Sequence, residues 1–272
     1  MRLPVLIFDI ETLTDLKAGA HLYNLDLPDD ELEQALIKLR RQEAGTDFQR
    51  LPLHEIVCIS GLWVDEHGMR LFSFSQEQYA EAEILRKFLS IFEKRHPTLV
   101  SWNGSQFDLP VILFRTMYHG LSAPSLFDQG EIDIQKRYNN YQNRYHHRHV
   151  DLMDVMAMFN GRNFQKLDDA AQLLGYPGKR AEGYRVPEQV QHGEWLELSQ
   201  HCEGDVLNTW LIYLRWLLLK GQLLAEDHRF WIQSTIAYLS QQPQQADFVR
   251  LWQDSSQHTE FTSHYIFPTV RD

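Results

Sequence analysis

Near its start the chain reads Pro4-Val5-Leu6-Ile7-Phe8-Asp9-Ile10-Glu11-Thr12. Such a continuous apolar run predicts a strand that is buried on both faces, in the middle of a sheet. Side chains two residues apart on a strand point to the same face, so Asp9 and Glu11 are expected to lie together. Two carboxylates at the end of a core strand are costly to desolvate unless a cation neutralises them, and divalent metal ions do this well. The alternative is that the strand ends there because a polar loop begins.

The composition predicts a soluble chain with a sizeable core. Of its 272 residues 43% are hydrophobic, so we expect one large domain or a domain with a helical extension. No apolar run approaches the roughly 20 residues of a membrane span, and the N-terminal run contains acids, unlike a signal peptide. The two cysteines, Cys58 and Cys202, lack disulfide or zinc-site spacing. They are expected to be buried thiols, which predicts a cytoplasmic location.

The formal net charge is −11, which argues against a generic nucleic-acid binder, since such proteins are usually basic. This argument is weak where acids are gathered to hold metal ions, because bound ions return part of the positive charge.

The apolar patterns predict a mixed sheet that is covered by helices, since most strand signals precede most helix signals. Further strands are predicted at 54–64, 69–75, 98–102 and around 150–153. Helices are predicted at 29–42, 77–95, 108–119, 167–174, 196–221, 226–241 and 244–253. Residues 122–149 and 178–193 are predicted to be irregular, and the tail after 253 is not expected to be ordered.

Two further acids stand at positions that suggest chemistry. Asp108 opens a predicted helix, directly after a turn at Asn103-Gly104. Asp205 lies inside a strongly apolar predicted helix, where Asp has poor propensity. His201 precedes it by four residues and therefore shares its helix face. The alternative for His201 and Asp205 is an ordinary surface pair one turn apart.

Taken in order, these motifs resemble those of the DEDD superfamily of 3′–5′ exonucleases. The motifs are Phe8-Asp9-Ile10-Glu11-Thr12, then Asn103 with Phe107-Asp108, then Asp205 with His201 before it. The resemblance is closest to the proofreading exonuclease domain of family B DNA polymerases. More narrowly, it is to the stand-alone bacterial family of predicted exonucleases related to that domain. It extends from about Val5 to Trp216.

The resemblance implies an α/β, ribonuclease H-like fold with a five-stranded mixed sheet flanked by helices. Residues 1–221 would form this domain, with a helical excursion at about 28–50, and residues 222–272 would form a C-terminal helical extension. The implied activity is hydrolysis by a two-metal-ion mechanism with Mg²⁺ or Mn²⁺. Asp9, Glu11 and Asp205 would hold the ion that activates water, and Asp9 and Asp108 would hold the second.

The position of His201 departs from the superfamily pattern. Family B proofreading domains carry Tyr four residues before the last Asp, and the branch that uses His as general base places it five before. This chain has His201 at the first spacing and Gln200 at the second. His201 is therefore either the general base or a residue that only positions the water or the phosphate.

The implied substrate is the 3′ end of a single strand, with DNA favoured over RNA, and no membrane is involved. The stretch 137–149 mixes cations with tyrosines, which suits a single-stranded backbone and its bases, although a solvated loop is the commoner reading. Core packing is the alternative for Trp102 and Phe107, and it is favoured for Phe107. The candidate substrate-binding residues are Ile10, Thr12, Trp102, Asn103, Phe107, Arg144 and Lys179.

Two other functions fit the same resemblance. One is a 3′–5′ exoribonuclease of the same superfamily. The other is a catalytically inactive nucleic-acid-binding protein, whose expected signature is a missing acid. None of the four acids, Asp9, Glu11, Asp108 and Asp205, is missing.

Overall fold

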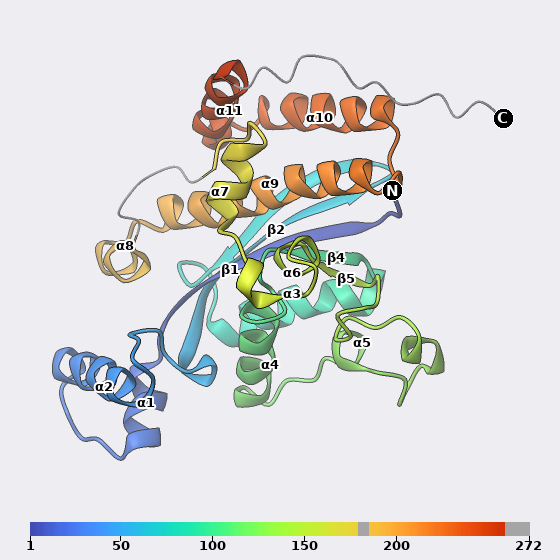
Figure 1. Ribbon diagram of the computed structural model, residues 1–272. Coiled ribbons are helices and arrows are strands. Elements are labelled where there is room, and N and C mark those ends of the chain that lie inside the picture. The colour runs from blue at the N-terminus through green and yellow to red at the C-terminus, as the bar shows by residue number, and fades with distance from the viewer. Residues whose placement is uncertain (179–184, 259–272) are drawn as a thin grey trace.

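The computed structural model describes residues 1–178 and 185–258 (Figure 1). The predicted contact at Lys179 and the predicted lack of order beyond residue 258 lie outside the described residues. The strands are β1 Val5–Thr14, β2 His54–Asp65, β3 Gly68–Ser75, β4 Thr98–Ser101 and β5 His149–Asp151. The helices are α1 Leu16–Tyr23, α2 Asp29–Ala44, α3 Glu81–Arg95, α4 Asp108–Tyr118, α5 Pro124–Phe127, α6 Leu152–Met156, α7 Leu167–Leu173, α8 Val186–His192, α9 Trp195–Leu219, α10 Ala225–Leu239 and α11 Ala246–His258. Short 3₁₀ turns lie at Leu51–Leu53, Ile134–Arg137, Gly161–Asn163 and Pro243–Gln245.

The five strands form one mixed sheet in the order β3-β2-β1-β4-β5. β1 pairs antiparallel with β2 and parallel with β4, so it stands at the centre as its apolar sequence predicted. β2 and β3 form an antiparallel hairpin, and β5 adds parallel to β4. The prediction of a five-stranded mixed sheet flanked by helices is confirmed.

Alternate side chains of β1 pack into two cores on opposite faces of the sheet. Val5 and Ile7 join the core that contains α9 and α10, whereas Leu6, Phe8 and Ile10 join the core that contains α3 and α4. Figure 1 shows α9 along one side of β1 and β2, and α3 on the other side. The period of two along a strand therefore directs the side chains at 9 and 11 to the α9 face.

The two central strands are irregular beside these acids. Glu11 stands opposite Cys58, but Thr12 stands opposite Ile56, so β2 contributes one extra residue at this point. Such a β-bulge bends a strand and changes the direction of its side chains, and bulges are frequent next to active sites. The bulge lies where β1 leaves the protein core.

The C-terminal helices pack onto the same core as the sheet. The Trp210 indole of α9 donates a hydrogen bond to Thr235 of α10, with 2.9 Å between Nε1 and Oγ1. The backbone N–H of Leu71 in β3 donates to the hydroxyl of Tyr238, at 2.7 Å. Phe248 of α11 is fully buried in this core. The domain boundary at residue 221 stays a prediction.

Several element predictions need correction. Helix α3 begins at Glu81 rather than 77, because the backbone turns at 76–79 and Ala80 is extended. The region 178–193 was predicted to be a loop, but it contains α8, which has Pro187 in its first turn and ends at Gly193 in the left-handed conformation. Helix α1 was not anticipated. The side chain of Asp15 caps it by accepting a hydrogen bond from the Ala18 N–H, at 2.8 Å.

Among the described residues no helix is long and apolar enough to cross a membrane.

Candidate metal centre

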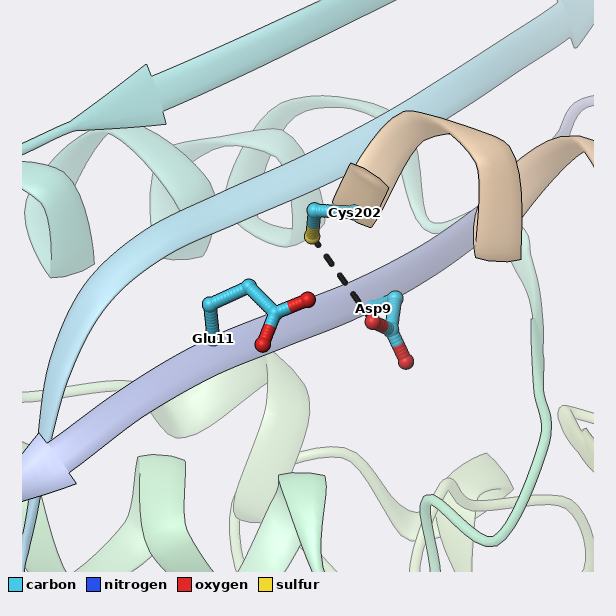
Figure 2. A group of neighbouring side chains, drawn as sticks. All are labelled: Asp9, Glu11 and Cys202. Atoms are coloured by element: carbon cyan, nitrogen blue, oxygen red, sulfur yellow. Dashed lines mark hydrogen bonds between the residues drawn. The ribbon is translucent and has the colours of Figure 1, made fainter. Parts of the chain in front are cut away.

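Two carboxylates of β1 and one thiol of α9 lie together at the predicted site. One ligand atom each from Asp9, Glu11 and Cys202 lie within 4.8 Å of one another (Figure 2). The Cys202 Sγ is 3.7 Å from Oδ2 of Asp9. Burial raises the pKa of the Cys202 thiol well above its usual value, and the neighbouring Cys58 and both carboxylates raise it further. Cys202 is therefore a neutral thiol that donates a hydrogen bond to Asp9.

Asp108 is a buried carboxyl on the first residue of α4. Burial raises its pKa to about 7, and the negative charges of Asp151 and Asp205 add to the rise. Hydrogen bonds from backbone N–H groups, including that of Ile10, oppose it. A carboxyl that stays half-protonated near neutral pH is one whose surroundings lack positive charge. The donor set therefore fits a divalent cation, which prefers such oxygen ligands.

Asp205 and Asp9 line the same groove, although they come from α9 and β1. This groove, of about 670 Å³, combines acids and one lysine with amide and apolar side chains. It is lined by Asp9, Trp102, Asn103, Met153, Phe164, Gln165, Lys166, Leu167, Asp168 and Asp205. Asp9 lies beside Glu11 and lines this groove together with Asp205. The negative charge of Asp205 in turn helps to raise the pKa of Asp108. The fold brings all four predicted acids to one region.

His201 is buried one helical turn before Asp205, on the same helix. The neighbouring Gln200 has a different role, since its side-chain amide donates to the backbone carbonyl of Gln244 at 2.8 Å. The residue at the alternative spacing is therefore used to hold the 3₁₀ turn before α11. Among the described residues, His201 belongs neither to the lining of the groove nor to the group of Asp9, Glu11 and Cys202, so its role stays a prediction.

Asp151 is a residue that the sequence reasoning missed. It is buried at the end of β5, and its two carboxylate oxygens accept the backbone N–H groups of Asn103 and Ser105, both at 2.9 Å. Asn103 has a φ of 67°, and a Cβ on Gly104 would lie 2.2 Å from the Ser101 Oγ. Asp151 therefore holds the strained turn that begins α4 and so sets the position of its first residue. The signal was available, because an acid at the end of a parallel strand points to the same sheet edge as the other acids.

The remaining predicted contacts fall into three groups. Trp102 and Asn103 line the groove, and Trp102 also packs in the core that contains α9, so their contact with substrate stays a prediction. Phe107 packs against the rings of Phe48 and His54, with centroids 5.5 and 5.0 Å away, which agrees with the favoured reading of core packing. The Arg144 guanidinium forms an ion pair with the buried carboxylate of Asp154.

Two further candidates for substrate binding, Ile10 and Thr12, lie on β1. The Ile10 side chain is buried in the core of α3 and α4, and only its N–H faces the site, where it bonds Asp108. The Thr12 hydroxyl lies 2.9 Å from Nδ1 of His54. Neither arrangement tests a substrate contact, so both stay predictions.

His149, beside Asp151, gives the protein a predictable pH dependence. Burial lowers the pKa of its imidazole to about 4, although Asp151 partly opposes this, and its Nε2 lies 2.8 Å from the Ser101 hydroxyl. The unfolded chain binds this proton near pH 6.5, whereas the folded chain does not until about pH 4. The free energy of unfolding should therefore fall as pH is lowered through that window, with a contribution on the order of 2 kcal/mol from this group.

Urea unfolding at pH 7.5 and pH 5, compared between the native chain and His149→Asn, measures this effect. We expect the variant to lose less stability between the two pH values than the native chain does. The exposed His67→Asn is the matched control and should behave like the native chain. Equal losses in all three proteins would refute the assignment to His149.

The chain is similar to a family of predicted exonucleases and to DNA polymerases. A sequence profile for a family described as predicted 3′–5′ exonucleases related to the exonuclease domain of PolB matches residues 46–256. A DNA polymerase of Pyrococcus glycovorans is 22% identical over 190 residues, which are 66% of this chain and 24% of the polymerase. The structure of the family B DNA polymerase from the hyperthermophilic archaeon Pyrobaculum calidifontis is similar with a TM-score of 0.51 and 19% identity, covering 80% of this chain and 25% of the polymerase.

The chain therefore spans about a quarter of the length of each of these polymerases. At this identity the structural likeness concerns the fold alone, and it confirms the predicted ribonuclease H-like architecture. The matched region begins after β1, so it contains Asp108 and Asp205 but not Asp9 and Glu11. Only the fold brings the β1 carboxylates to the matched region.

Proposed function

The chain belongs to the family of predicted 3′–5′ exonucleases related to the exonuclease domain of PolB, and on this premise we propose that it removes nucleotides from the 3′ end of a single strand in a metal-dependent reaction. DNA is the favoured substrate. The observation that carries the proposal is the convergence of acids from three separate elements: Asp9 and Glu11 of β1, Asp108 of α4 and Asp205 of α9.

The four carboxylates would hold two Mg²⁺ or Mn²⁺ ions. Asp9, Glu11 and Asp205 would bind one ion, and Asp9 with Asp108 would bind the other. When bound, the ions supply the positive charge that makes water a stronger nucleophile at neutral pH and that stabilises the leaving 3′ oxygen. The raised pKa of Asp108 supports this assignment, because a buried carboxyl beside two others is short of a cation.

The protein's own groups would orient the strand. Trp102 and Asn103 line the same groove as Asp9 and Asp205, so a terminal nucleotide in the groove would lie against them. An aromatic face binds any base by stacking, which suits an enzyme that removes nucleotides regardless of sequence. The carboxylate of Asp151 accepts the backbone N–H of Asn103 and so fixes the turn that leads to Asp108. The neutral Cys202 thiol holds one rotamer of Asp9 through its hydrogen bond.

His201 would be the general base or a residue that positions the water, and substitution separates these roles. We expect His201→Gln to lower kcat by about 10²-fold, the lower end of the range for removal of a general base, and to remove the acid limb of the pH–rate profile. Gln200→Ala is the matched control on the same helix and should leave kcat unchanged, because its side chain bonds Gln244. A lowered kcat with an unchanged pH profile would assign His201 to positioning instead.

The proposed function is tested with a 5′-labelled single-stranded DNA and a single-stranded RNA of equal sequence. In Mg²⁺ or Mn²⁺ we expect a ladder that shortens from the 3′ end of the DNA, and no products in EDTA. A ladder on RNA alone would favour the exoribonuclease. Binding of both strands without any cleavage would identify an inactive binding protein and would overturn the proposal.

A further inference from the structure

A second groove lies on the other face of the sheet, between β3 and α3, and the proposed reaction does not use it. Its volume is about 370 Å³, within the range of small-ligand sites. Figure 1 shows α3 on the side of the sheet opposite α9, and none of the residues that line this groove lines the groove of the metal centre. Its lining combines aromatic rings with cations.

The aromatic floor of the groove consists of Trp63, Phe72 and Phe74, which the pairing of β2 with β3 brings together. Phe72 and Phe74 are two residues apart on β3, and the α3-facing core also contacts Trp63 of β2. Gly61 stands opposite Phe72, and a Cβ there would lie 2.6 Å from the Phe72 Cζ, so the ring rests directly on the backbone. The rings of Phe72 and Phe74 have centroids 5.0 Å apart. All three aromatic side chains are only half-buried, so the floor remains accessible.

Four cations surround this floor in a chain whose formal net charge is −11. Lys87, Lys94 and Arg95 recur at seven- and eight-residue spacing, which places them on one face of α3. Arg70 of β3 also lines the groove, and none of the described residues that line it is an acid. Lys87 lies over the ring of Tyr79, with 4.1 Å from Nζ to the centroid.

Two acids near the groove compensate part of this charge. Glu83 lies 3.7 Å from Lys87, and Asp65 accepts a hydrogen bond from the Trp63 indole at 2.8 Å. Arg95 also interacts with Asp65, and its charge helps to lower the pKa of that carboxyl after the larger effect of the Trp63 hydrogen bond. Within the described part of the chain, no ion pair is formed by Arg70 or Lys94. The groove therefore offers positive charge and flat apolar surface together.

We propose that this groove binds a segment of the single strand upstream of the 3′ end whose hydrolysis is proposed above. Sequence-independent binding of single strands combines cations that follow the phosphates with aromatic rings on which bases stack. The metal centre carries negative charge until it is loaded, so it cannot by itself attract a polyanion. A cationic groove elsewhere on the surface supplies the attraction that the acids lack. The inference rests on the proposed function for its substrate class.

The test compares two double charge reversals by fluorescence anisotropy with a 12-nucleotide DNA in EDTA, where no hydrolysis occurs. Lys94→Glu/Arg95→Glu alters the groove, and Lys17→Glu/Lys38→Glu alters exposed lysines of α1 and α2 by the same charge. We expect Kd to rise about tenfold in the groove variant and to change little in the control. The slope of log K against log salt should also fall by about 1.4 in the groove variant, from 0.7 for each phosphate contact.

Two further measurements keep the inference separate from the proposed function. Hydrolysis of a trinucleotide in Mg²⁺ should have the same KM in all three proteins, because the groove is proposed to bind the strand upstream of its terminal nucleotides. In the native chain, a photoreactive uracil placed upstream of the 3′ end should form adducts with Trp63, Phe72 or Phe74, which tests the groove without any substitution.

Equal Kd values in both double variants, or adducts confined to other elements, would overturn the groove assignment while leaving the proposed function intact. A chain that hydrolyses no strand but still shows the Kd difference would overturn the proposed function and keep the groove. Binding of polyglutamate at the groove, with no competition from DNA, would assign the groove to an acidic protein partner and overturn the inference.

Discussion

Asp9→Ala is expected to lower the rate of 3′-end hydrolysis by at least about 10³-fold. Asp9 is the carboxylate shared by both proposed ions, and it lies beside Glu11 and in one groove with Asp205. Loss of metal-based stabilisation of the transition state costs several kcal/mol, and about 4 kcal/mol corresponds to three orders of magnitude in rate. The measurement is single-turnover cleavage of 5′-labelled single-stranded DNA in saturating Mg²⁺ or Mn²⁺.

Glu66→Ala is the matched control, because Glu66 is an exposed acid in the β2–β3 turn and should leave the rate unchanged. Calorimetric titration with Mn²⁺ provides a readout that does not depend on activity. We expect two ions in the native chain and weaker or fewer ions in Asp9→Ala. If the variant kept native rates and native stoichiometry, Asp9 would not be a ligand and the site would need to be assigned again.

Arg115→Met is expected to cost about 3–5 kcal/mol of folding free energy, the range for removing one partner of a buried ion cluster. The guanidinium is buried at the end of α4 and donates to Asp15 at 2.6 Å and to Glu81 at 2.5 Å. Glu81 also accepts the Ile56 N–H at 2.8 Å, so the cluster connects the ends of β1, β2, α3 and α4. Without the guanidinium, Asp15 would stay buried with no cation in the cluster, and Glu81 would keep the His119 imidazole as its partner.

Thermal unfolding followed by circular dichroism measures this effect, and a loss of this size should lower Tm by roughly 10 °C. Arg41→Met removes an arginine from an exposed pair with Asp47 and is the matched control, expected to leave Tm nearly unchanged because water screens that pair. Equal Tm values for the two variants would show that the buried cluster contributes no more than an exposed pair.

Much of the architecture can be predicted from the sequence, because the pattern that indicates each strand or helix lies within that segment. The continuous apolar runs of β1 and α9 indicate elements that are buried on most sides, and the hairpin 54–75 is indicated by two apolar stretches around a turn. The acids inside these elements were likewise visible, since an acid in a core strand or an apolar helix is rare without a partner, although β1 continues past Asp9 and Glu11 to Thr14 rather than ending at them. What the local pattern missed were short helices: α1 and α8, and also α5, which lies in the region 122–149 that is predicted to be irregular.

The sequence by itself determined the mixed α/β sheet, the same-face acids Asp9 and Glu11, and the family to which their order points. Only the tertiary structure decided what stands opposite them. Cys202 reaches Asp9 because α9 crosses β1, and Asp151 holds the Asn103 turn because β5 pairs beside β4. The same holds for the cationic groove, which joins residues of a hairpin to one face of α3. Periodicity states which face of an element is buried, but its neighbour depends on the packing of segments that lie far apart in the chain.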